Sequence, residues 1–182
     1  MVADALTERW GLGRPRKRYR GRIAEGRAAG APGSGYLTAG ESGDEASASI
    51  DRPARPRVAV LWPQTYMNEA GRSVGPARGA LHVPLDRVLV VHDEIDIPFG
   101  EVRARLGGGL AGHNGLKSLK RELGGPEFVR VRVGVGRPAS SDPEIVSAYV
   151  LGRFREDSEQ VRDLVQRAAD IVQRIVLGEE PI

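Results

Sequence analysis

The stretch Val90–Leu123, "VVHDEIDIPFGEVRARLGGGLAGHNGLKSLKREL", predicts strand, strand, glycine-rich turn and helix in close succession. The run "RVLVVH" that leads into it is apolar and β-branched, as is typical of a strand buried on both faces. "EVRARL" alternates, which places Arg103 and Arg105 together on one face of a second strand. "NGLKSLKREL" has leucines at helical spacing and Gly124 directly after it, which predicts a helix ending at Leu123.

The segments that flank this stretch extend the pattern. "RVAVLW" (57–62) predicts another buried strand, and "NEAGRSVGPARGALHV" (68–83) predicts a helix despite its glycines and proline. "FVRVRVGVG" (128–136) alternates again, and residues 157–177 carry the clearest helical stripe, which ends at Gly178. We therefore expect an α/β fold: one three-layer domain over residues 1–182, with a mixed, mostly parallel central sheet flanked by helices.

The N-terminal third is less regular. Residues 2–10 show a short helical stripe, whereas residues 26–57 are rich in Gly, Ala, Ser and Pro. This composition predicts a flexible insertion over about 26–57, with "YLTAG" (36–40) as a brief strand inside it.

Composition narrows the classes of protein. No run of about 18 apolar residues predicts a membrane span, and the first residues do not resemble a signal peptide, so we expect a cytoplasmic protein. The absence of cysteine excludes disulfides and thiolate chemistry. The net charge is only +3, but residues 9–27 hold eight basic side chains against the single acid Glu25. This basic segment is either a solvated surface or a footprint for phosphates.

"HDEID" (92–96) has three interpretations. A metal site would use His92 with the acids, but three histidines and no cysteine supply few ligands. Acids that form caps and salt bridges at a strand end are the more common case. Alternatively, one carboxylate orients a histidine base, as in hydrolases that activate water. Alternation predicts that His92, Glu94 and Asp96 point one way and Asp93 the other.

"GGGLAG" (107–112) matches G-x-G-x-x-G, but the charged strand before it is unlike a dinucleotide-binding strand, and Gly115 is followed by Leu116 where a phosphate loop has lysine. Glycines let the backbone approach a ligand, and the next helix offers free N–H groups. His113 and Asn114 either face such a ligand, or Asn114 caps the helix. Asn68 has the same two interpretations, and Tyr66 can belong to the core.

Three blocks together resemble the bacterial-type peptidyl-tRNA hydrolase family, over roughly residues 57–177. These blocks are "PQTYMNEAGRSV", "VVHDEIDIPFGEVRARLGGGLAGHNGLKSL" and "EFVRVRVGVGRP". The resemblance implies a monomeric α/β domain without cofactor or metal, which hydrolyses the ester between a peptide and the 3′ ribose of tRNA.

The resemblance also implies roles for residues. Asp93 matches the aspartate that orients and stabilises a histidine general base. The residues matched to substrate and tRNA contacts are Tyr66, Asn68, His113, Asn114, Arg103, Arg105 and Arg132. One departure lies at Leu110 and Ala111, where the family usually has histidine and glycine.

A larger departure concerns the start of the chain. Members of the family begin with an apolar strand and a loop that carries the base, and only then a helix similar to "VADALTERW". The resemblance therefore implies that the first strand and the base histidine are absent here, because His82, His92 and His113 all match other positions.

Three accounts are compatible with this departure. The chain is an incomplete gene product, a non-catalytic RNA-binding relative, or an enzyme in which His113 has become the base. We favour the first, because losing a strand of about 5–6 residues leaves neighbouring backbone groups unpaired and harms folding. The chain as given is then expected to be inactive.

Overall fold

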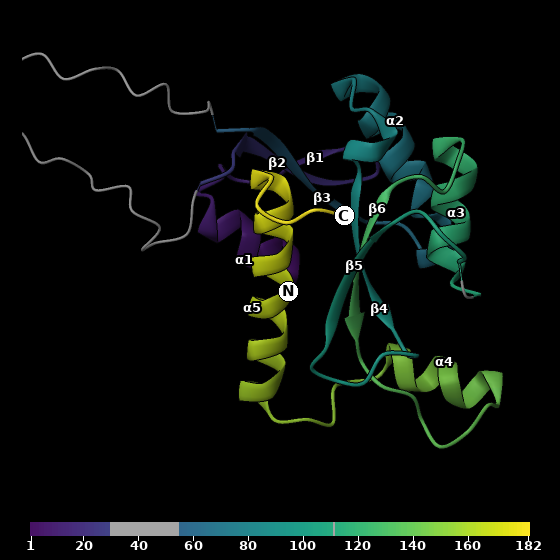
Figure 1. The fold of residues 1–182 in the computed structure, drawn as a ribbon. Coiled ribbons are helices and arrows are strands. Elements are labelled where there is room, and N and C mark those ends of the chain that lie inside the picture. The colour runs from purple at the N-terminus through teal and green to yellow at the C-terminus, as the bar shows by residue number, and fades with distance from the viewer. Residues whose placement is uncertain (30–54, 111) are drawn as a thin grey trace, which may run out of the picture.

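The computed structural model describes residues 1–29, 55–110 and 112–182 (Figure 1). The helices are α1 (Val2–Arg9), α2 (Gly71–Leu81), α3 (Asn114–Leu123), α4 (Pro143–Leu151) and α5 (Ser158–Leu177), with 3-10 turns η1 (Met67–Glu69) and η2 (Leu85–Arg87). The strands are β1 (Arg16–Arg18), β2 (Gly21–Arg27), β3 (Arg57–Pro63), β4 (Leu89–Glu94), β5 (Val102–Leu106) and β6 (Val129–Gly134).

The strands form two three-stranded sheets, ordered β1-β2-β3 and β4-β6-β5. The α/β class is confirmed, but the expectation of one mostly parallel sheet is wrong. Only β4 and β6 pair in parallel, whereas β1–β2, β2–β3 and β5–β6 are antiparallel. The physical reason lies in the alternation of β5, which exposes one face to water as antiparallel strands commonly do.

A β-hairpin of β1 and β2 precedes the predicted strands. Tyr19 and Arg20, with φ of 53° and 52°, form its tight turn. The basic run around this turn has no apolar alternation, so it gave no strand signal. The predicted insertion is also too long at its edges, because Gly26 and Arg27 belong to β2 and Arg57 begins β3. Its middle, with the expected "YLTAG" strand, lies outside the described residues.

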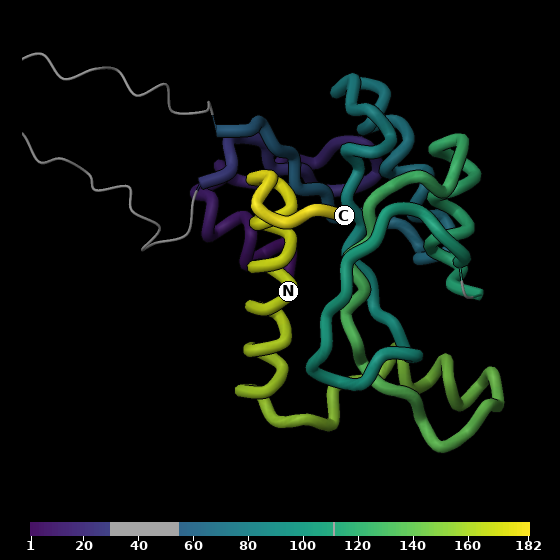
Figure 2. Tube along the Cα trace, in the orientation of Figure 1, coloured from purple at the N-terminus to yellow at the C-terminus, as the bar shows by residue number. Residues whose placement is uncertain are grey.

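The core of the second sheet has a layer on each face. On one face Val131, Val91 and Val102 pack against α5, which also contacts α1 (Figure 2). On the other face, Leu116 and Leu119 of α3 pack with the buried ring of Phe128. The two layers hold this sheet between helices, as the three-layer expectation requires.

Helix ends follow the signals in the sequence. α3 stops at Leu123 with Gly124 in the left-handed conformation (φ 83°), and α5 stops at Leu177 with Gly178 at φ 75°. The Asp157 side chain caps α5 by accepting from the backbone N–H groups of Glu159 and Gln160. α4 was not predicted, because its apolar residues form no stripe. None of the helices in the described ranges has the length and apolar character needed to cross a membrane.

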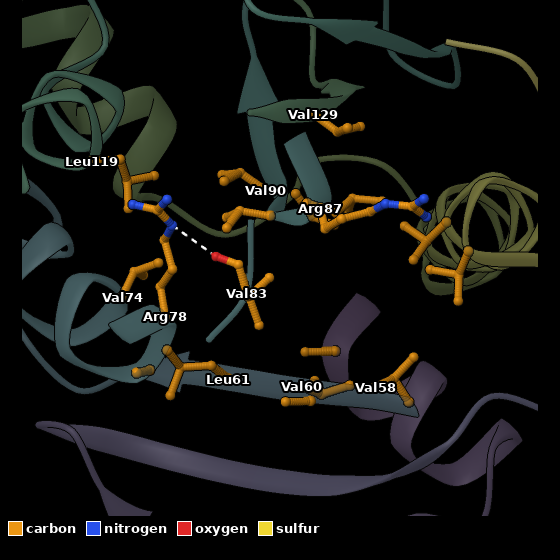
Figure 3. A pocket seen from close by; sticks show the side chains of 18 of the residues that line it. Val58, Val60, Leu61, Val74, Arg78, Val83, Arg87, Val90, Leu119 and Val129 are labelled. Atoms are coloured by element: carbon orange, nitrogen blue, oxygen red, sulfur yellow. Dashed lines mark hydrogen bonds between the residues drawn. The ribbon is translucent and has the colours of Figure 1, made fainter. Parts of the chain in front are cut away.

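A large cavity separates the two sheets. It has a volume of about 980 Å³ and is lined mainly by apolar side chains (Figure 3). Val58 and Val60 of β3 lie on one side of it and Val90 of β4 on the other, and Arg78 donates to the Val83 carbonyl at its margin (2.9 Å). The two sheets are therefore held together by helices and not by a shared ladder.

The α3 layer gives a test of this packing. Leu119 is 4% exposed, whereas Leu151 at the end of α4 is 75% exposed. We expect Leu119→Ala to lower the free energy of unfolding by about 2–5 kcal/mol, because the deletion leaves a cavity in the core. Leu151→Ala should change it by about 0.5 kcal/mol or less. Urea denaturation measures both, and equal losses would contradict the assigned core.

Candidate functional site

A carboxylate–imidazole pair lies where β4 meets the start of α3. His113 Nε2 is 3.7 Å from Asp93 Oδ1. The His113 N–H, although distant for a hydrogen bond, is the main cause that lowers the pKa of the Asp93 carboxyl, and burial opposes it without reversing it. Asp93 is thus held as an anion beside a ring N–H.

The His113 ring also caps α3. Its Nδ1 accepts from the backbone N–H groups of Gly115 (3.1 Å) and Leu116 (3.3 Å). Since Nδ1 is an acceptor, the proton of the neutral ring sits on Nε2, facing Asp93. The interpretation of Asn114 as the cap is therefore wrong: Asn114 is the first residue of α3, is exposed, and faces Lys117 Nζ at 3.4 Å.

His92 completes a pair of imidazoles. Its ring meets the edge of the His113 ring, with the centroids 5.0 Å apart. His92 Nδ1 donates to the Asp93 carbonyl at 2.7 Å, so Nε2 of the neutral ring carries the lone pair. That atom is buried without a hydrogen-bond partner, and burial lowers the pKa of His92. His113 thus lies against both residues, although alternation places His92 and Asp93 on opposite faces.

The other acids of this segment form ion pairs. Glu94 is buried and receives the Arg132 guanidinium at 3.1 Å, and Asp96 receives that of Arg137 at 2.6 Å. The salt-bridge interpretation is confirmed for these two acids. Within the described ranges, no group of three or more histidines and acids is arranged to hold a metal ion.

Asn68 and Tyr66 lie on the neighbouring 3-10 turn. Asn68 sits inside η1 and does not cap α2, whose first flanking residue is Ala70, so that interpretation is wrong. Tyr66 is 83% exposed and does not belong to the core. Met67 packs against Gly115, and it lines the cavity together with Asp93 and His113. The amides of Asn68 and Asn114 therefore flank the hollow where Asp93 lies.

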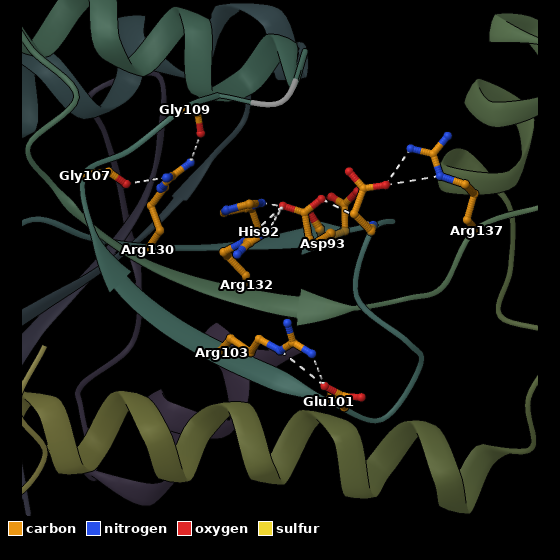
Figure 4. A network of polar contacts seen from close by, with 11 residues as sticks. His92, Asp93, Glu101, Arg103, Gly107, Gly109, Arg130, Arg132 and Arg137 are labelled. Atoms are coloured by element: carbon orange, nitrogen blue, oxygen red, sulfur yellow. Dashed lines mark hydrogen bonds and ion pairs between the residues drawn. The ribbon is translucent and has the colours of Figure 1, made fainter. Parts of the chain in front are cut away.

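Four arginines share one face of the second sheet. Register places Arg103 opposite Arg132 and Arg105 opposite Arg130, as partners that point to the same side. Arg103 pairs with Glu101 at 2.6 Å and Arg132 with Glu94, whereas Arg105 makes no ion pair with any described residue (Figure 4). The predicted basic face exists, and Arg105 holds its uncompensated charge.

Arg130 has a structural role that sequence reasoning missed. Its side chain is nearly buried, and it donates to the carbonyl of Gly109 (2.7 Å) and to that of Gly107 (Figure 4). Burial, and then the neighbouring Arg105 and Arg132, lower the pKa of this guanidinium. The alternation of "VRVRV" indicated its face but not its partners. Arg130 thus shapes the glycine-rich turn, where Gly108 (φ 93°) leaves room for the Arg105 side chain.

Comparisons with known proteins agree with this geometry. A family model described as peptidyl-tRNA hydrolase matches residues 1–180. A peptidyl-tRNA hydrolase of Mycobacterium sp. (strain KMS) is 41% identical over 179 residues, covering 94% of this chain and 91% of the relative. One from Granulibacter bethesdensis is 37% identical, covering 98% and 78%. The crystal structure of peptidyl-tRNA hydrolase from Acinetobacter baumannii superposes with a TM-score of 0.73 at 27% identity, covering 98% of this chain and 78% of that one.

The buried imidazole gives a pH test. Because the pKa of His92 is lowered in the folded state, the unfolded chain takes up its proton first as the pH falls through about 6.5, and folding loses stability below that pH. We expect His92→Asn, which keeps a donor for the Asp93 carbonyl, to flatten the loss of stability between about pH 7.5 and 5.5.

Urea denaturation across this range measures the effect. The control is His82→Asn, at an exposed, left-handed position that asparagine tolerates. If both variants show the same pH slope as the wild type, the assignment of His92 as a buried neutral ring is wrong.

Proposed function

Because the chain belongs to the peptidyl-tRNA hydrolase family, hydrolases that act on the ester bond of peptidyl-tRNA, we propose that its site cleaves the ester between the peptide and the 3′ ribose of tRNA. The observation that carries this proposal is the anionic Asp93 held beside an imidazole N–H at a cavity mouth. Such a carboxylate orients and stabilises a histidine that removes a proton from water.

The flanking amides and rings take the substrate. Asn68 and Asn114 are exposed on either side of the hollow and can donate hydrogen bonds to the peptide carbonyls. His113 and Tyr66 complete the substrate-contacting set. No metal or cofactor enters this proposal, which takes the protein to be a cytoplasmic monomer.

The identity of the general base is the finer part of the proposal. The chain has three histidines. His113 cannot take a proton from water while Nδ1 accepts from two backbone N–H groups and Nε2–H faces Asp93. His92 has a lone pair on Nε2, but that atom is buried. His82 caps α2. We take the base to be none of these three, so the 182-residue chain binds substrate but turns it over slowly.

A second function follows from the same tautomers. If the chain is a non-catalytic relative, it binds tRNA and no base restores turnover. The two functions differ in whether Asp93 has a catalytic role, and imidazole in solution distinguishes them.

Imidazole should restore hydrolysis in an Asp93-dependent manner. We expect N-acetylaminoacyl-tRNA to be cleaved by the 182-residue protein faster as imidazole is added, after subtraction of the protein-free rate. Asp93→Asn should reduce this rescued rate by about 10²-fold or more, since it removes the anion that stabilises the imidazolium. Asp96→Asn, at an exposed ion pair nearby, should leave it unchanged.

Three outcomes count against the proposal. Absence of rescue would favour the binding function. A rescued rate equal in Asp93→Asn would deny Asp93 its role. Full turnover without imidazole that is lost in His113→Asn would assign the base to His113.

The tRNA surface is tested separately. Arg105 carries the uncompensated charge of the basic face, so Arg105→Ala should weaken tRNA binding and lower the salt slope of log K by about 1. Arg103→Ala should weaken it less, because Glu101 already neutralises that guanidinium. The control is Arg162→Ala, at an exposed position on α5. Filter binding at several salt concentrations measures all three, and equal effects would remove the basic face from the tRNA site.

A further inference from the structure

We propose that the cavity between the two sheets is a slot for an additional β-strand, filled by an extended apolar peptide segment that pairs with β3 on one side and β4 on the other. This inference is independent of the proposed function, because it rests on the backbone and the lining of the cavity. It also supplies what the fold lacks, a ladder between its two halves.

The backbone edges carry the first step. β3 pairs with β2 along Arg57–Pro63, and β4 pairs with β6 along Leu89–Glu94. In the part of the chain that the structure describes, no backbone hydrogen bond joins β3 to β4. Both strands nevertheless line the cavity, so two rows of N–H and C=O groups face it from opposite sides. Buried backbone groups of this kind are almost always paired in native proteins.

The lining specifies the side chains of the occupant. α1 and α5 contribute Leu6, Val172 and Val176 on one side, and α2 and α3 contribute Val74 and Leu116 on the other (Figures 1 and 3). A strand sends successive side chains to opposite faces. The occupant therefore needs apolar residues at consecutive positions, as in a strand buried on both faces.

Size and chemistry exclude other occupants. The cavity holds about 980 Å³, whereas apolar cavities of about 150 Å³ already take up small apolar molecules. A helix or an apolar small molecule would leave both backbone edges unpaired. A second copy of this chain would have to offer β1 or β5, the other edge strands, which carry Arg16–Arg18 and the pair Arg103 and Arg105. An apolar extended segment is the occupant that satisfies both edges and the lining.

One end of the slot opens at the candidate site. Asp93, His113 and Met67 line the same cavity as Val58 and the other apolar residues. A strand in the slot would therefore bring one of its ends to the Asp93 carboxylate and close the site from that side.

A synthetic peptide tests the slot with the protein as it is. The probe is the acetylated hexapeptide Lys-Val-Leu-Val-Val-Lys, which copies the apolar centre of β4 between two lysines and has a typical strand length of about 5–6 residues. We expect it to raise the melting temperature. We also expect amide hydrogen exchange to slow at least about tenfold in residues 58–61 and 88–91. The matched control is the same peptide with alternate amides N-methylated, which keeps the apolar side chains but removes one row of donors.

Several outcomes would overturn the proposal. These are no stabilisation, protection that does not favour β3 and β4, or equal binding of the N-methylated peptide, which would show apolar contact without strand pairing. Edge amides already protected in the free monomer would show that β3 and β4 pair directly. Concentration-dependent dimers with protected edges would show that a second copy fills the slot. Each result is independent of turnover, so a failure here leaves the proposed ester hydrolysis to its own test.

Discussion

The two nitrogens of His113 have different partners, and the arrangement of the site depends on that difference. Nδ1 accepts from two backbone N–H groups at the start of α3, so Nε2–H faces Asp93 at the end of β4. One ring therefore satisfies a helix terminus and lowers the pKa of a carboxyl group. Because His113 takes the capping position, the Asn114 side chain stays at the surface, where a ligand can reach it. The same bonds that make His113 a good anchor make it a poor base.

The arginines of the second sheet divide into those that build the protein and those that face solvent. Arg130 is buried and spends its donors on the carbonyls of the glycine-rich turn, and Arg132 is held by the buried Glu94. Removing either would leave a buried acceptor or charge unpaired, which is costly. Arg105 has no such partner among the described residues. A basic face read from alternation alone would treat all of these side chains as equivalent, whereas burial and pairing separate them.

Local signals predicted the local elements well. The apolar run of β4, the leucine spacing of α3 and the glycines after α3 and α5 each depend on neighbours in sequence, and the structure confirms them. The β1–β2 hairpin failed because its basic residues show no period, and the division into two sheets failed because strand pairing is a long-range property. At the site, alternation indicated the face of Arg130 but not its carbonyl partners. The helix cap was assigned to Asn114 because an imidazole ring is an uncommon cap. The expected absence of a first strand and a base histidine stays a prediction.

The division into two sheets also explains how the two halves of the site are held. Asn68 follows β3 and Asp93 ends β4, and no ladder connects these strands in the described structure. Their relative position depends instead on α2 and α3, where the Gly71 N–H donates to Ser118 Oγ at 3.0 Å and Gly71 leaves no room for a side chain against Ser118. A helix contact of this kind fixes one end of the cavity but not its length. A strand paired with both β3 and β4 would connect the halves directly, so the order of the site and the filling of the slot should be coupled.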